Sequence, residues 1–111
     1  MRQWNVDPKL LCKKHLLGEH VECHMFAGTI KKGISIDGYL LNKLVDIGTI
    51  KIRHDILVEE MKKRGMNHKS ELTKFNEGKE MKTVDSKENL KELCKRCKDC
   101  KRRIEDETSA H

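Results

Sequence analysis

The chain has 111 residues, of which 38% are charged and 36% hydrophobic, and its formal net charge is +6. This length predicts one domain with a modest core, and the basic charge is compatible with a nucleic-acid partner. No apolar run approaches the roughly 18 residues that a membrane span needs, and from the polar first residues we expect no signal peptide. We therefore expect a cytoplasmic protein with no membrane partner, whose five cysteines are reduced.

The first half of the chain predicts three helices. Asp7 as N-cap and Pro8 as first helical residue begin a helix expected to reach about Phe26, before the Gly28 and Lys31–Gly33 breaks. A turn over residues 35–38 precedes a short helix over residues 39–45. Ile50, His54, Leu57 and Met61 then fall at helical spacing, which predicts an amphipathic helix over residues 50–64 that Gly65 ends.

The second half predicts a linker and one more helix. Residues 73–84 are polar, and Asp85–Glu88 fits a capping box that begins a helix reaching about Ile104. Residues 87–103 carry eight Lys and Arg against three acidic residues, and an acidic tail follows. We predict a mainly α fold with a helical core in residues 1–72, a linker over 73–84 and a basic, cysteine-containing helix in 85–111 that docks loosely.

Titratable residues gather on the first predicted helix. At about 100° per residue, His15, Glu19 and Glu22 share one face, whereas His20 and His24 form an i,i+4 pair on the opposite side. An apolar stripe of Leu10, Leu17, Val21 and Met25 lies between them. The cluster fits an ordinary solvated face. It also suggests a metal site, although its spacing differs by one residue from HExxH and HxxEH.

A third interpretation comes from a family resemblance. The run Lys14-His15-Leu16-Leu17-Gly18-Glu19-His20-Val21-Glu22 resembles the pyrimidine-dimer DNA glycosylases of the phage endonuclease V type, at the matching distance from the chain start. Two further stretches, residues 28–32 and 56–67, resemble a glycine-basic stretch and a helix ending in Lys-Arg-Gly-x-Asn. The resemblance covers about residues 1–70 and implies a small helical DNA-repair enzyme.

The resemblance also implies a reaction and its residues. Family enzymes are bifunctional glycosylase/AP lyases in which the α-amine attacks C1′ of the damaged nucleotide, an imine forms, and β-elimination cuts the strand. In an alignment without gaps, Met1 occupies the place of the family's N-terminal nucleophile. The bulky Arg2 should prevent removal of the initiator methionine, so we expect the mature α-amine to belong to Met1. Glu22 matches the catalytic carboxylate. No cofactor is implied, and we expect a monomer acting on double-stranded DNA with damaged bases.

DNA contacts are expected from a set of polar and basic residues. The candidates are Arg2, His15, Glu19, Lys31, Lys32 and Arg64, with further phosphate contacts possible from Lys13, Lys14, Arg53, Lys63 and Lys69. Glu19 could instead orient the amine or be structural. Trp4 or Phe26 could serve as a wedge between bases, although core packing is the more ordinary role. Val21 and Met25 replace two arginines of the phage-type enzyme, so the preferred lesion could differ.

The C-terminal cysteines allow three interpretations. Cys94, Cys97 and Cys100 form a CxxCxxC run that could bind zinc, with a fourth ligand from Cys12, Cys23 or a histidine. They could equally pack as small apolar residues, since Leu93, Cys97, Cys100 and Ile104 repeat at helical spacing, or act as a redox switch. Besides the repair enzyme, the sequence therefore leaves open a non-catalytic nucleic-acid-binding module and a zinc-binding protein.

Overall fold

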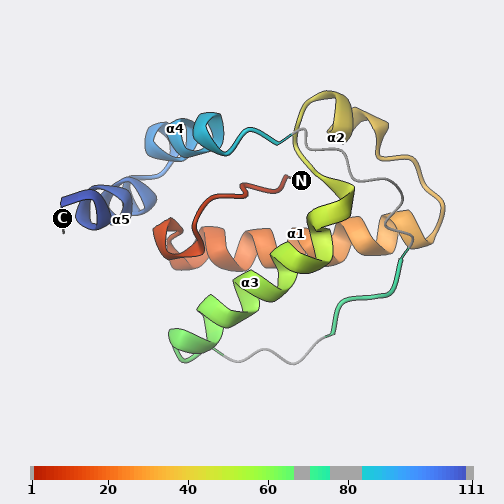
Figure 1. Cartoon of the computed structure of the whole chain (residues 1–111), viewed down its shortest axis with the longest axis horizontal. Coiled ribbons are helices and arrows are strands. Elements are labelled where there is room, and N and C mark those ends of the chain that lie inside the picture. Colours follow the sequence, from red (N-terminus) through yellow and green to blue (C-terminus); the bar gives the residue numbers. More distant parts are fainter. Residues whose placement is uncertain (1, 67–70, 76–83, 110–111) are drawn as a thin grey trace.

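The computed structural model describes residues 2–66, 71–75 and 84–109. Within these ranges the chain forms five α-helices and two short 3-10 helices, with no strand (Figure 1). The predicted mainly α fold class is confirmed. In the part of the chain that the structure describes, no helix is both long enough and apolar enough to span a membrane.

The predicted first helix is two separate elements. Asp7 caps the short 3-10 helix η1 (Pro8–Leu10) by accepting the Lys9 N–H at 3.0 Å. The backbone then extends through Leu11 and Cys12, which buries both side chains, and α1 (Lys13–Lys31) follows. Asp7 was therefore correctly predicted as an N-cap, but it caps the short η1 and not the long helix.

The end of α1 also lies later than predicted. The helix passes Phe26 and Gly28 and ends just before Gly33, which has φ +74°. A glycine inside a helix costs roughly 1 kcal/mol. Burial of Phe26 and Ala27 on the same turn of α1 offsets that cost, so the predicted break at Gly28 does not occur.

The middle of the chain forms two further helices. The short α2 (Asp37–Leu41) is earlier and shorter than the predicted 39–45 helix, because Lys43 takes a left-handed φ of +57°. The 3-10 helix η2 (Ile47–Thr49) leads directly into α3 (Ile50–Lys63). The bounds of α3 and its stop at Gly65, with φ +75°, confirm the prediction there.

The C-terminal region differs most from expectation. Instead of one helix it holds α4 (Ser86–Arg96) and α5 (Lys98–Ser109), separated by an extended Cys97. Asp85 caps α4 as predicted, accepting the Lys87 and Glu88 N–H groups. The docking is close rather than loose, because Leu93 and Cys100 are both fully buried. Most of the predicted linker, residues 76–83, lies outside the described residues.

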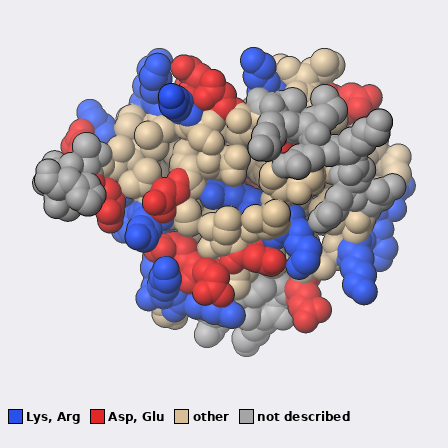
Figure 2. Space-filling view, in the orientation of Figure 1, with Lys and Arg blue, Asp and Glu red and all other residues tan. Residues whose placement is uncertain are grey.

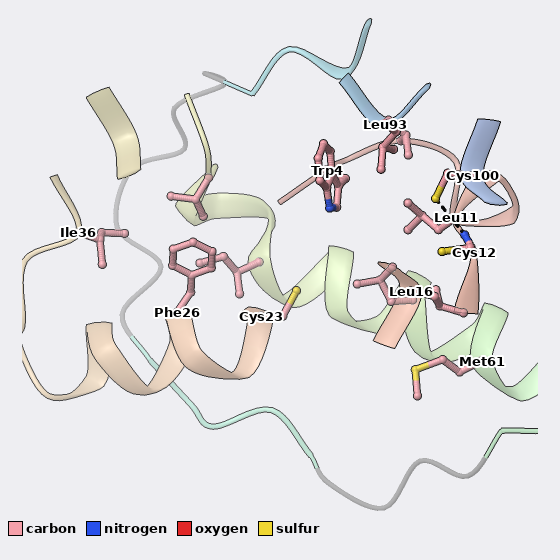
Figure 3. Packing of buried hydrophobic residues seen from close by; sticks show 14 residues of the cluster. Trp4, Leu11, Cys12, Leu16, Cys23, Phe26, Ile36, Met61, Leu93 and Cys100 are labelled. Carbon is pink, nitrogen blue, oxygen red and sulfur yellow. Dashed lines mark hydrogen bonds between the residues drawn. The ribbon is translucent and has the colours of Figure 1, made fainter. Parts of the chain in front are cut away.

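The core fills the space around the crossing of α1 and α3 (Figure 1). Figure 3 shows Phe26 and Ile36 toward one end, and Trp4, Leu11, Leu93 and Cys100 toward the other. The core therefore extends beyond residue 72 into the C-terminal helices. Trp4 and Phe26 are 6% and 0% exposed, so both have the core role rather than that of a wedge.

Candidate active site

The N-terminal segment is fixed by hydrogen bonds to the loop that precedes α3. Gln3 is fully buried, and its backbone N–H donates to the Leu44 carbonyl at 2.6 Å. Its side-chain oxygen accepts the Asp46 N–H at 2.7 Å, and its amide lies 3.4 Å from Thr49 Oγ1. A buried amide with this many partners holds its segment in one position.

Helix α4 holds the same segment from another side. Asn89, 8% exposed, donates through its side-chain amide to the Trp4 carbonyl at 2.8 Å and the Gln3 carbonyl at 3.3 Å. One helical turn earlier, Ser86 Oγ donates to the Asn5 carbonyl at 2.6 Å. Residues 3–5 have no secondary structure of their own, and side chains of α4 thus supply hydrogen bonds to their backbone carbonyls.

The segment ends beside Glu22. The Arg2 N–H donates to Glu22 Oε2 at 3.3 Å, and the Arg2 guanidinium lies over the Trp4 ring at 4.4 Å from its centroid. The same guanidinium lies 3.4 Å from Asn89 Oδ1. Met1 is outside the described residues, but it is joined covalently to the Arg2 nitrogen. The carboxylate of Glu22 therefore lies one residue from the chain start.

The environment of Glu22 suits proton transfer. Burial raises the pKa of this half-buried carboxyl above its ordinary value, Glu19 raises it further, and the hydrogen bond from Arg2 opposes the change. A carboxyl with a raised pKa exchanges a proton more readily near neutral pH than an ordinary glutamate does. Arg2 and Glu22, two of the predicted site residues, are thus brought together.

Glu19 is buried in an ion pair and does not face the solvent. It is 1% exposed and forms a two-point ion pair with Arg53, whose Nη2 lies 2.9 Å from Glu19 Oε1 and whose Nε donates to Oε2. Arg53 is itself 4% exposed. Neither side chain reaches solvent, so neither can make the expected DNA contact in this structure. The structural alternative for Glu19 fits this placement.

Arg64 is also used inside the protein. Its Nε donates to Glu60 at 2.8 Å, and its Nη2 donates to the carbonyls of Leu11 at 2.8 Å and Pro8 at 3.1 Å. It thereby links the end of α3 to the backbone carbonyls of η1 and of Leu11, which follows it. These internal hydrogen bonds do not favour the predicted DNA contact of Arg64. Lys31 and Lys32, by contrast, are exposed at the end of α1.

His15 lies among sulfur atoms rather than beside Glu22. Its Nδ1 is 3.2 Å from Cys12 Sγ and 3.5 Å from Cys100 Sγ, and its ring meets Trp4 edge-on with centroids 5.8 Å apart. Burial, and then the charge of Lys14, lower the pKa of His15 and favour the neutral ring. The predicted DNA contact of His15 is therefore not favoured by its position.

Comparison with known protein families gives a match over the first two thirds of the chain. Residues 1–74 fit the family model described as pyrimidine dimer DNA glycosylase. The matched range includes Arg2 and Glu22. The chain belongs to this family. Its function class is accordingly DNA repair by glycosylase action on pyrimidine dimers. No curated protein and no solved structure gives a significant match.

The family match ends before α4 and α5. This pyrimidine dimer glycosylase therefore positions its N-terminal segment partly with Asn89 and Ser86, which lie outside the matched residues. Nothing in the N-terminal motif indicates that partner. The signal available was the Asp85 cap, which predicted a helix at Ser86 without predicting what it contacts.

An exposed apolar strip runs along α1 next to Glu22. Leu17, Val21 and Met25, which sequence periodicity placed on an apolar stripe, are 36%, 52% and 49% exposed. The buried face of α1 instead consists of Leu16, Glu19, His20, Cys23, Phe26 and Ala27. Exposed apolar side chains thus occupy positions 21 and 25 of α1, close to Glu22 in the sequence, where the resemblance expects arginines.

Three histidines form a group that sequence analysis missed. His20 and His24 approach each other at 3.3 Å as the predicted i,i+4 pair, and His54 of α3 packs on both, with ring centroids 5.0 and 4.8 Å away. The pair was predicted to lie on the helix face opposite Glu19, which is wrong, because Glu19 contacts Arg53 and His20 contacts His54, both on α3. The position of His54 within the apolar periodicity of α3 was the available signal.

The main cavity in the described part of the chain does not include Glu22. It has a volume of about 810 Å³ and lies between α3 and residues 71–75. Its lining includes His54, Leu72 and Phe75, but neither Arg2 nor Glu22. On the face drawn in Figure 2, Lys and Arg side chains alternate with acidic ones. Charge on that face is therefore mixed rather than gathered into one basic area.

Proposed function

We propose that this protein excises pyrimidine dimers from double-stranded DNA and then cuts the strand as an AP lyase, with the Met1 amine as nucleophile and Glu22 as catalytic carboxylate. The observation that carries the proposal is the hydrogen bond from the Arg2 N–H to Glu22 Oε2 at 3.3 Å. It brings the residue next to the chain start against the half-buried carboxylate of a chain that belongs to the glycosylase family.

The nucleophile needs an unprotonated amine near neutral pH. An α-amine has an ordinary pKa of about 7.7–8.0, far below that of lysine at about 10.4, so a useful fraction is already neutral. The amine nitrogen attacks C1′ as the bond from C1′ to the base breaks, and the base leaves with the bonding electrons. Loss of the amine proton and opening of the sugar ring then give the imine.

Glu22 supplies the charge and the proton transfers that these steps need. As a carboxylate it stabilises positive charge that develops at C1′, and it can accept and return protons during imine formation. In β-elimination a base removes a C2′ proton, and the C3′–oxygen bond breaks with its electrons going to the leaving phosphate. The raised pKa of Glu22 supports this exchange.

The DNA surface would surround this carboxylate. Lys31 and Lys32 are exposed and can contact phosphates. The exposed Val21 and Met25 beside Glu22 offer apolar contact to bases or sugars, whereas arginines there would contact phosphates. We therefore expect the DNA affinity of this protein to depend less on salt concentration than the affinity of an arginine-lined site would.

Borohydride trapping on a DNA duplex with one abasic site tests the proposal. Reduction converts an imine into a stable amine, so wild-type protein should form a covalent protein–DNA adduct. Protein whose α-amine has been blocked by reductive methylation should form none. Protein taken through the same treatment without the aldehyde, so that its α-amine stays free, is the matched control. Absence of any adduct would favour a non-catalytic DNA-binding module that kept the scaffold.

Asn89 provides a test of how the N-terminal segment is positioned. Replacing Asn89 with Ala removes the two hydrogen bonds to the Gln3 and Trp4 carbonyls. We expect the rate of trapping to fall by roughly 10-fold or more, because a displacement of about 1 Å can cost 10²-fold in rate. The affinity for abasic DNA should change little, since Asn89 is buried and acts through the segment.

The control for this variant is Asn42→Ala. Asn42 is also an asparagine whose amide donates to a backbone carbonyl, that of Gly38 at 2.7 Å, but it does so within the end of α2. It should trap at the wild-type rate. Equal rates for Asn89→Ala and wild type, with both proteins folded by circular dichroism, would contradict a positioning role for α4.

A further inference from the structure

Four potential metal ligands from two distant parts of the chain meet at one place. Cys12 and His15 lie at the start of α1, and Cys97 and Cys100 lie at the start of α5, more than 80 residues later. Their ligand atoms all lie within 4.8 Å of one another. We propose that Cys12, His15, Cys97 and Cys100 form a structural zinc site that joins the two helix starts.

The separations fit a tetrahedral ion. Zinc bonds of about 2.3 Å to sulfur and 2.0–2.1 Å to nitrogen place two sulfurs about 3.8 Å apart and a sulfur and nitrogen about 3.6 Å apart. Cys12 Sγ lies 3.7 Å from Cys97 Sγ, and His15 Nδ1 lies 3.5 Å from Cys100 Sγ and 3.2 Å from Cys12 Sγ. Small movements of these side chains complete the coordination.

The local backbone explains why the four atoms converge. In each pair, the first ligand is the extended residue just before a helix and the second lies three residues later, in the first turn. The spacings Cys-x-x-His and Cys-x-x-Cys bring both side chains to the same end of the helix. Ligands from Cys94, Cys97 and Cys100 on one straight helix could not surround an ion. The extended backbone at Cys97 separates α4 from α5, so such a straight helix does not form.

Backbone donors support charged sulfur at this place. The Cys12 N–H donates to Cys100 Sγ at 3.2 Å, and the Cys100 N–H donates to Cys97 Sγ at 3.4 Å (the first contact is drawn in Figure 3). These bonds hold the sulfurs in place and stabilise thiolate over thiol. The first bond links the two helix starts, and the second closes a turn at the start of α5, as expected around a coordinated ion.

The ligand types suit a zinc ion. Three cysteine sulfurs and one imidazole nitrogen make up one of the common donor sets of structural zinc sites. On binding, zinc would displace the thiol protons and neutralise two of the three thiolate charges.

The alternatives explain the cluster less completely. Packing accounts for Cys100, which is fully buried, but a polar imidazole among three sulfurs is a poor apolar filler. Cys94 belongs to the same CxxCxxC run, yet it is absent from the group, which favours a selected set of ligands over a general cysteine stripe. A disulfide between Cys12 and Cys97 would leave Cys100 and His15 without a role.

Metal content of the full-length protein tests the proposal. Protein purified under reducing conditions, loaded with zinc and freed of excess metal should retain about one zinc per chain. Cobalt(II) in place of zinc should give the thiolate-to-cobalt charge-transfer bands and strong visible bands of a tetrahedral site. Cys12→Ser and Cys97→Ser should lower the zinc affinity at least about 100-fold, because even changes outside the coordination sphere cost 10–100-fold.

Two controls separate this site from others. Cys94→Ser removes the neighbouring cysteine, and His24→Ala disrupts the histidine group of α1 and α3; both should bind zinc as wild type does. Retention of zinc by Cys12→Ser and Cys97→Ser, or no metal in wild type, would overturn the proposal. A Cys12–Cys97 disulfide found in protein made without reductant, together with no zinc uptake after reduction, would also overturn it. None of these measurements requires DNA, so they are independent of the proposed reaction.

Discussion

Replacing Glu22 with Gln should abolish imine trapping and strand cutting while leaving DNA binding intact. The amide keeps the size of the side chain and can still accept the Arg2 N–H, but it can neither carry the charge nor transfer the proton. General acid–base catalysis contributes about 10²–10⁴-fold, so we expect a loss of at least that size in the trapping rate. The measurement is single-turnover trapping on abasic DNA beside an equilibrium binding titration.

A matched control is Glu105→Gln, which removes an exposed carboxylate on α5. It should trap like wild type. A Glu22→Gln protein that binds and traps at the wild-type rate would contradict the catalytic role of Glu22. Loss of both binding and folding would mean only that Glu22→Gln disrupts the protein. Glu22→Asp then separates a catalytic role from a structural one, because it keeps the charge on a shorter side chain. It should restore folding without restoring full activity.

Removing Glu19 should destabilise the fold more than removing the acidic partner of any other ion pair in the described part of the chain. Glu19→Ala leaves the guanidinium of Arg53 buried and unpaired at 4% exposure. Breaking a buried ion pair from one side costs about 3–5 kcal/mol. A protein of this size has a total stability of about 5–15 kcal/mol, so the midpoint of denaturant unfolding should fall sharply.

Two comparisons make this prediction specific. Glu105→Ala removes an exposed pair with Lys101 and should cost no more than about 1 kcal/mol. The double change Glu19→Leu with Arg53→Met removes both buried charges and should recover much of the loss. A Glu19→Ala protein as stable as the Glu105→Ala protein would show that Glu19 and Arg53 do not support the core.

Sequence reasoning predicted what depends on local chemistry. The Asp7 and Asp85 caps and the glycine stop after α3 are set by neighbouring residues, and each is found where it was predicted. It also selected Arg2 and Glu22, through the family motif, as residues of one site. Helix length was harder, because packing of Phe26 carries α1 through Gly28 against the local preference.

Tertiary contacts could not be predicted from one sequence. A polar Glu19 next to Glu22 fits a site as well as it fits a buried pair, and only the placement of Arg53 on α3 decides between them. Asn89 and the C-terminal cysteines act through residues more than 80 positions away. Periodicity placed Cys97 inside a helix, whereas its contact with Cys12 requires the extended backbone found there.

The most direct test of the central claim locates the trapped bond within the protein. Wild-type protein is reduced onto abasic DNA with borohydride, digested with nuclease and protease, and mapped by mass spectrometry. We predict that the sugar remnant is attached to the α-amine of the peptide that begins at Met1. Attachment to a lysine side chain, or an adduct equally abundant in Glu22→Gln, would contradict the proposed reaction.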